Sequence, residues 1–119
     1  MQTNPPSVSR SRLKLRIQAA ADSTLVLCCG KLTSEVAAEF KQEVRALIPQ
    51  TKRIVLDLNE VGFMDSSGLG AIIGVYVTAK SARCELQLVN LSKKVSELLG
   101  MAKLLSVFGS AGQYGARTL

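Results

Sequence analysis

Apolar and polar residues alternate with two different periods along this chain, and the changes of period divide it into strands and helices. Residues 13–19 alternate apolar with mostly charged side chains, as a half-buried strand does. Residues 24–29 and 84–89 are short apolar runs that predict two further strands. Residues 54–58 form a similar run, which predicts a central strand buried on both faces. The first two strands are close enough in the chain to form a hairpin.

Apolar residues at helical spacing predict three helices. Thr33 or Ser34 can cap the first of them, and Pro49 follows its last residue. Gly100 stands just past the end of the third, where glycine is common. The predicted helices span residues 33–48, 67–81 and 91–99.

The order of these elements is mostly alternating, which favours parallel strands joined by helical crossovers. We therefore expect an α/β fold: a single domain with a mixed sheet of about four to five strands and three to four helices packed on it. Val55 and Ile73 are expected in its core, and residues 106–108 as a short edge strand. Residues 1–11 are polar and include two prolines, so they are expected to form a flexible basic arm before a domain at residues 12–119.

The net charge of +6 is unevenly placed. Arg10, Arg12, Lys14 and Arg16 carry four positive charges, and no acid precedes Asp22. Such an excess can indicate nucleic acid or an anionic surface, but it also fits a solvated tail and the outer face of the first strand. No aromatic platform or basic helix accompanies the charge, so direct nucleic-acid binding is not expected.

The cysteines and the apolar segments indicate the cellular compartment of the protein. Cys28, Cys29 and Cys84 are odd in number and lack the spacing of a metal site or of a redox pair. The first residues lack the apolar stretch of a secretory signal, and no segment reaches the ~18–20 apolar residues of a membrane span. We expect a cytoplasmic protein that does not insert into membranes.

The most informative segment is Asp65-Ser66-Ser67-Gly68, between the predicted strand at 54–58 and the apolar helix that follows. The N–H groups at the start of a helix lack partners and carry the positive end of the helix dipole. A phosphate group would be favoured there, and so would an ordinary serine cap. For Ser66 both interpretations are open, and Asp65 is itself a candidate cap.

Catalysis by this segment alone is not expected. The chain contains no histidine to act as a general base, and it has neither a Gly-x-Ser-x-Gly elbow nor a phosphate-binding loop ending in Lys-Ser or Lys-Thr. Asp57, Glu60 and Asp65 are too scattered to predict a metal site. We expect no catalytic residues, no metal and no cofactor, and hence no enzyme.

The run IVLDLNEVGFMDSSGLGAIIGVY, at residues 54–76, resembles the signature segment of the STAS domain. Within that family it most resembles bacterial anti-sigma-factor antagonists, and the similarity extends from Leu13 to Phe108. The resemblance implies a protein-binding switch: an anti-sigma factor with serine kinase activity binds the unphosphorylated antagonist and phosphorylates the serine that follows the aspartate, here Ser66. A phosphatase would reset the switch, and ATP would belong to the kinase.

The same resemblance implies that a partner contacts the residues around Ser66, namely Met64, Asp65, Ser67, Gly68 and Leu69. Two positions depart from the family pattern. Thr33 stands where an acidic residue is frequent, and residues 109–115 are glycine-rich where a helix is frequent. The alternative function is a STAS subunit of a transporter or of a stress-signalling scaffold that no kinase switches.

Overall fold

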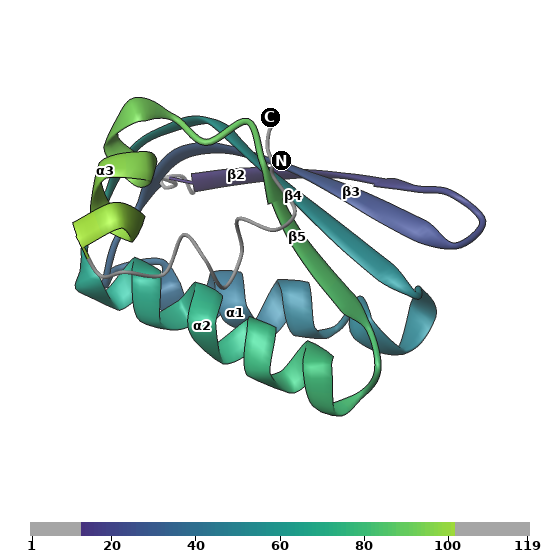
Figure 1. Cartoon of the computed structure of the whole chain (residues 1–119). Coiled ribbons are helices and arrows are strands. Elements are labelled where there is room, and N and C mark those ends of the chain that lie inside the picture. The colour runs from purple at the N-terminus through teal and green to yellow at the C-terminus, as the bar shows by residue number, and fades with distance from the viewer. Residues whose placement is uncertain (1–12, 102–119) are drawn as a thin grey trace, which may run out of the picture.

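The computed structural model describes residues 13 to 101, which form one sheet with two helices packed against one of its faces (Figure 1). The sheet has four strands in the order β2-β3-β4-β5. β2 and β3 are antiparallel and form the predicted hairpin, whereas β4 runs parallel to both β3 and β5. The mixed sheet and the α/β class are therefore confirmed. The strands are β2 (Leu13–Ala19), β3 (Ser23–Leu32), β4 (Arg53–Met64) and β5 (Glu85–Val89).

The helices occupy two places relative to the sheet (Figure 1). α1 and α2 lie side by side across one face, and α3 lies at one end of the sheet, where it packs against β4. A short 3-10 helix, η1, follows α1. The helical segments are α1 (Ala37–Arg45), η1 (Ile48–Gln50), α2 (Ser66–Ser81) and α3 (Lys93–Met101).

The core lies between the sheet and the two helices. The strand register places Val26, Leu56 and Leu88 in one row across β3, β4 and β5, and none of them is more than 2 % exposed. Phe40 of α1 and Ile72 of α2 are buried in the same cluster. Burial of side chains of this size contributes about 1.5–3 kcal/mol each relative to exposure, so this layer is the main source of stability.

The opposite face of the sheet is not covered by the described helices, which corrects two predictions. Val55 lies on that face, level with Leu25 and Gln87, and is only half-buried. Ile73 is half-buried on α2. Neither belongs to the buried core. β4 is not buried on both faces, because α1 and α2 cover a single face of the sheet (Figure 1). An apolar residue on a strand does not reveal which face the helices cover.

The predicted helix ends also need correction. α1 begins at Ala37, with Val36 at the capping position and no side-chain cap, so neither Thr33 nor Ser34 caps it. α1 ends at Arg45, so Pro49 does not directly follow its last residue and lies inside η1 instead. α3 continues through Gly100 to Met101. Residues that favour helix starts and stops are weak local signals, which tertiary context often overrides.

Other predictions fall partly or wholly outside the described residues. The arm at residues 1–11, the strand at residues 106–108 and the glycine-rich segment lie outside them. Within residues 13–101, no helix is long and apolar enough to cross a membrane. Cys28 is buried and Cys29 is exposed. Burial, with a smaller effect from Asp57, raises the pKa of Cys28 to about 12, so this thiol stays protonated at neutral pH.

Candidate functional site

Asp65 is the single residue between the end of β4 and the start of α2, and it caps the helix. Its backbone is extended, with φ −105° and ψ −175°. Its Oδ1 accepts a hydrogen bond from the backbone N–H of Gly68 at 2.9 Å. This is the geometry of an aspartate N-cap, which satisfies one of the unpaired donors at the helix start. The capping position therefore belongs to Asp65 and not to Ser66.

The other oxygen of Asp65 reaches a loop far away in the sequence. Oδ2 accepts a hydrogen bond from the backbone N–H of Ser34 at 3.1 Å, and the N–H of Asp65 donates to the carbonyl of Leu32 at 3.3 Å. Because β3 and β4 are parallel and Leu32 pairs with Met64, the chain leaves both strands at the same edge of the sheet. Asp65 thus joins the two loops at this edge.

These hydrogen bonds determine the charge of the site. The N–H of Gly68 makes the largest contribution to lowering the pKa of Asp65, and the N–H groups of Ser34 and Ser67 lower it further, against a smaller opposing effect of desolvation. Hydrogen bonds to the ionised form favour that form. The carboxylate is therefore negative at neutral pH.

Ser66 and Ser67 are the first two residues of α2, and both are exposed. Neither hydroxyl has a hydrogen-bond partner within the described part of the chain. Since Asp65 supplies the cap, the stability of the helix start does not depend on either hydroxyl. Both are free to react or to contact a partner.

The two glycines that follow have different surroundings. Gly68 is buried, and a Cβ there would overlap the carbonyl oxygen of Leu32 and lie 2.9 Å from its Cγ. Only glycine lets the first turn of α2 approach the end of β3 so closely. Gly70 is exposed and has no atom within 4 Å of such a Cβ. Gly68 lets α2 start close to β3, whereas a side chain at Gly70 would meet open space.

The apolar residues beside the serines are exposed to solvent to different degrees. Phe63 is 48 % exposed, Leu69 is half-buried and Met64 is 7 % exposed. Of the residues expected to contact a partner, Met64 and Gly68 therefore have little or no surface to offer, while Asp65, Ser67 and Leu69 do. Sequence analysis missed Ser34, whose N–H holds Asp65 in place. The sequence singled out Ser34 as a candidate cap of the helix that follows, and that signal does not point to Asp65.

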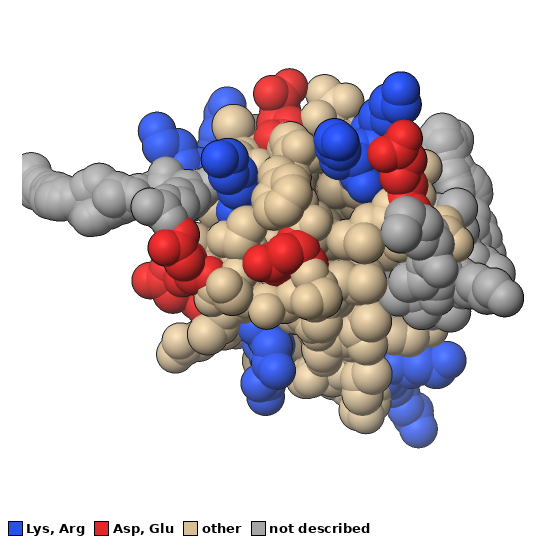
Figure 2. Space-filling model, turned by 90° about the vertical axis from the view of Figure 1, so that its left-hand side faces the viewer, with Lys and Arg blue, Asp and Glu red and all other residues tan. Residues whose placement is uncertain are grey.

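Charged residues of both signs lie on the end of the molecule that contains the start of α2 (Figure 2). Figure 2 views the end of the molecule at which α2 begins, and there Lys and Arg side chains are interspersed with Asp and Glu. Among residues 13–101, no group of three or more histidine, cysteine or acidic side chains could hold a metal ion. The described part of the site has free hydroxyls, a fixed carboxylate and a helix start, which suit binding and modification.

The fold and the site together define a small α/β domain that presents a serine pair at a capped helix start. Residues 15–108 match the family model described as "Mlab, STAS domain". The chain belongs to the STAS domain family.

Curated relatives are similar to this chain in sequence, and solved structures are similar to it in fold. It is 38 % identical over 97 residues to the anti-sigma F factor antagonist of Paenibacillus polymyxa, covering 80 % of this chain and 83 % of the relative. Its fold is similar to an anti-sigma factor antagonist from Mycobacterium paratuberculosis, with a TM-score of 0.74, 18 % identity and 87 % of each chain covered. It is also similar to phosphorylated SpoIIAA from Bacillus, with a TM-score of 0.64, 17 % identity, and 80 % of this chain and 87 % of that chain covered.

Proposed function

We propose that this protein is an anti-sigma factor antagonist whose binding is switched at Ser66. With Ser66 unphosphorylated it binds an anti-sigma factor and so frees a sigma factor in the cytoplasm. The anti-sigma factor has serine kinase activity and phosphorylates Ser66, which releases the complex, and a phosphatase reverses the step. The protein is then a regulatory binding module and not an enzyme.

One observation carries the proposal: Ser66 is exposed at the first position of α2, and its hydroxyl is not used for capping. A serine cap would lose its helix-stabilising hydrogen bond on modification. Here Asp65 holds the helix start, so Ser66 can gain a phosphate without that loss. The named functions of the relatives support the same role, since they are antagonists matched over most of their length.

The choice of Ser66 over Ser67 rests on the family resemblance, because both side chains are exposed. The serine directly after the aspartate is the phosphorylated position in the antagonists that this segment resembles. Ser67, Leu69 and the exposed Phe63 are then the candidate contacts around it. An aromatic residue beside a switch position is well suited to anchor a partner.

Phosphorylation would act mainly on the partner. It adds about −1.5 to −2 charges next to the ionised Asp65. The helix start stabilises a phosphate by about 0.3–1 kcal/mol at an exposed end, so no large refolding is expected. A partner packed against a neutral hydroxyl would instead meet a poorly compensated charge, at a cost of about 2–5 kcal/mol. A loss of about 3–4 kcal/mol lowers affinity by two to three decades.

The alternative of a transporter or scaffold subunit is not favoured. The relatives that match over most of their own length are named as anti-sigma factor antagonists. We therefore propose one class of binding partner for the serine site, the anti-sigma factor.

The test is incubation with ATP and candidate anti-sigma kinases from the same genome, followed by mass spectrometry and calorimetry. We expect phosphate on Ser66, no phosphate on Ser66→Ala, and continued phosphorylation of the matched control Ser67→Ala. Ser66→Asp should fold normally and bind the partner much more weakly, while Ser66→Ala should keep binding. Phosphate on Ser67, or equal affinity of Ser66→Asp and the unmodified protein, would contradict the proposal.

A further inference from the structure

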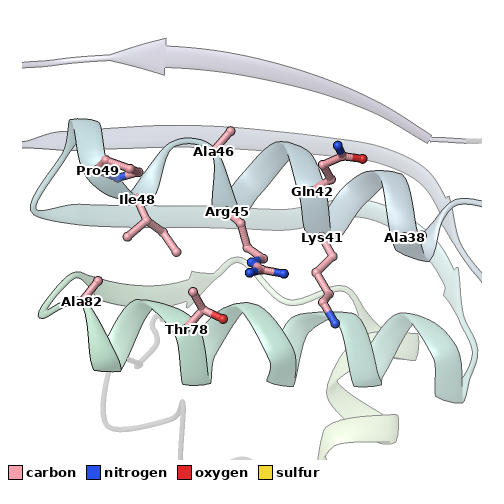
Figure 3. A pocket seen from close by; sticks show the side chains of 9 residues that line it. All are labelled: Ala38, Lys41, Gln42, Arg45, Ala46, Ile48, Pro49, Thr78 and Ala82. Carbon is pink, nitrogen blue, oxygen red and sulfur yellow. The ribbon is translucent and has the colours of Figure 1, made fainter.

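A groove with a volume of about 800 Å³ runs between α1 and α2, away from the serine pair (Figure 3). Its walls come from α1, from the turn that leads into η1, and from the second half of α2. The residues that line it are Ala38, Lys41, Gln42, Arg45, Ala46, Ile48, Pro49, Thr78 and Ala82.

Two cations give this groove its charge. Lys41 and Arg45 stand one helical turn apart on α1, and both side chains extend toward α2 (Figure 3). The stem of Lys41 lies over Gly74, where a Cβ would come within 3.4 Å of it. Neither cation has an ion pair or hydrogen bond with the described residues, and no acidic residue lines the groove. The groove therefore carries two uncompensated positive charges.

Apart from Gln42 and Thr78, the rest of the lining is apolar and mostly small. Ala38, Ala46 and Ala82 let another backbone approach closely, beside Ile48 and Pro49. Thr78 adds little polarity, since its hydroxyl already donates to the carbonyl of Gly74 at 3.0 Å. An occupant that fits needs apolar side chains together with two carboxylates about one turn apart. An amphipathic helix with acidic residues beside its apolar stripe has this arrangement, and such helices bind grooves in this way.

We propose that the groove between α1 and α2 is a second docking site, which takes an acidic amphipathic helix of a partner protein. Gly74, over which Lys41 lies, stands about 12 Å along α2 from Ser66, at a rise of ~1.5 Å per residue. This separation exceeds the Debye length of ~8 Å at physiological salt. Docking in the groove is therefore independent of the charge at Ser66, and it does not depend on the function proposed above.

The test uses the full chain, isotope-labelled for NMR, and two synthetic helical peptides. One peptide carries an apolar stripe flanked by glutamates one turn apart, and the other is identical except for lysines in their place. We expect the acidic peptide to shift the amides of the groove and to bind at least tenfold more tightly than the lysine peptide. Ser66→Asp should bind it with unchanged affinity.

Charge variants of the protein test whether the peptide binds in the groove. Lys41→Glu/Arg45→Glu should weaken the acidic peptide by about tenfold or more, because two attractive pairs become repulsive. Lys93→Glu/Lys94→Glu on α3 makes the same change of charge outside the groove and should leave binding intact. Lys41→Gln/Arg45→Gln should show an intermediate loss of affinity for the acidic peptide. Its amide spectrum should be normal, which would show that affinity is lost because contacts are removed and not because the protein unfolds.

Four results with the peptides would overturn the inference. They are an absence of shifts, shifts that lie outside the groove, equal binding of both peptides, and equal loss in the α3 control. Inorganic phosphate that produced the same shifts at similar concentrations would instead make the groove a site for small anions, and this too would overturn docking of a helix.

Discussion

The carboxylate of Asp65 accepts a hydrogen bond at 3.1 Å from the backbone N–H of Ser34, a residue 31 positions earlier in the chain. The same carboxylate caps α2 through the N–H of Gly68. One side chain thus ties the loop after β3 to the start of the helix that presents Ser66. The position of the proposed switch residue is set by the packing of two parallel strands, and a short peptide carrying the motif would lack this constraint.

Replacing Asp65 by alanine should lower stability in a pH-dependent way. The pKa of Asp65 is lowered in the folded protein, so its contribution is fully present above its unfolded value of about 3.9. It is lost as the pH falls through the lower folded value. Urea unfolding should therefore show a gap between Asp65→Ala and the original protein that is widest near neutral pH and closes under acid conditions.

The control for this measurement is Glu43→Ala, which removes an exposed acid of α1. Its unfolding midpoint should stay close to that of the original protein at each pH. A gap for Asp65→Ala that was constant with pH would mean that the charge of the carboxylate contributes nothing to folding.

Gly68→Ala and Gly70→Ala should change stability in opposite directions. Alanine is usually better than glycine inside a helix by about 0.8–1 kcal/mol. At Gly70 the added Cβ meets no atom within 4 Å, so a gain of up to about 1 kcal/mol is expected. At Gly68 the Cβ would overlap the backbone of Leu32, and overpacking of this kind costs about 1–3 kcal/mol. Thermal unfolding of the two variants, side by side, measures both effects. If Gly68→Ala were as stable as Gly70→Ala, the close approach of α2 to β3 would be wrong.

Leu56→Asp and Val55→Asp should differ sharply, although the two residues are neighbours on β4. Leu56 is fully buried beneath the helices, and an unpaired charge there should prevent folding. Val55 is half-buried on the uncovered face, so its aspartate variant should fold with reduced stability. Circular dichroism and urea unfolding would distinguish them. A cooperatively melting Leu56→Asp protein would contradict the orientation of β4.

Phe63→Ala and Met64→Ala should separate partner binding from stability. Phe63 is 48 % exposed, so its loss should weaken binding to the anti-sigma factor while leaving unfolding nearly unchanged. Met64 is buried, and its truncation should destabilise the domain by about 2–5 kcal/mol. Calorimetric titration and chemical unfolding of both variants test this. Unaltered partner affinity for Phe63→Ala would remove Phe63 from the docking surface.

Local patterns were sufficient for most elements of the fold. The two periods of apolar residues predicted the hairpin, the run that became β4, and the helix that became α2, because side-chain alternation and helical spacing are properties of neighbouring residues. The serine pair was found in the same way, since Asp65, Ser66 and Ser67 are adjacent in the chain. The family resemblance from which the function of the serine pair was inferred also lies in one continuous segment.

What the sequence alone determined is therefore the order and type of the elements and the identity of the candidate switch residue. Only the tertiary structure decided that the carboxylate of Asp65 also holds the loop after β3, because its contact with Ser34 joins residues that the parallel strands bring together. It also decided which residues are buried. Val55 and Leu56 are equally apolar, as are Phe63 and Met64, and within each pair the difference depends on which face of the sheet the helices cover. That choice results from packing between distant segments, and no local pattern records it.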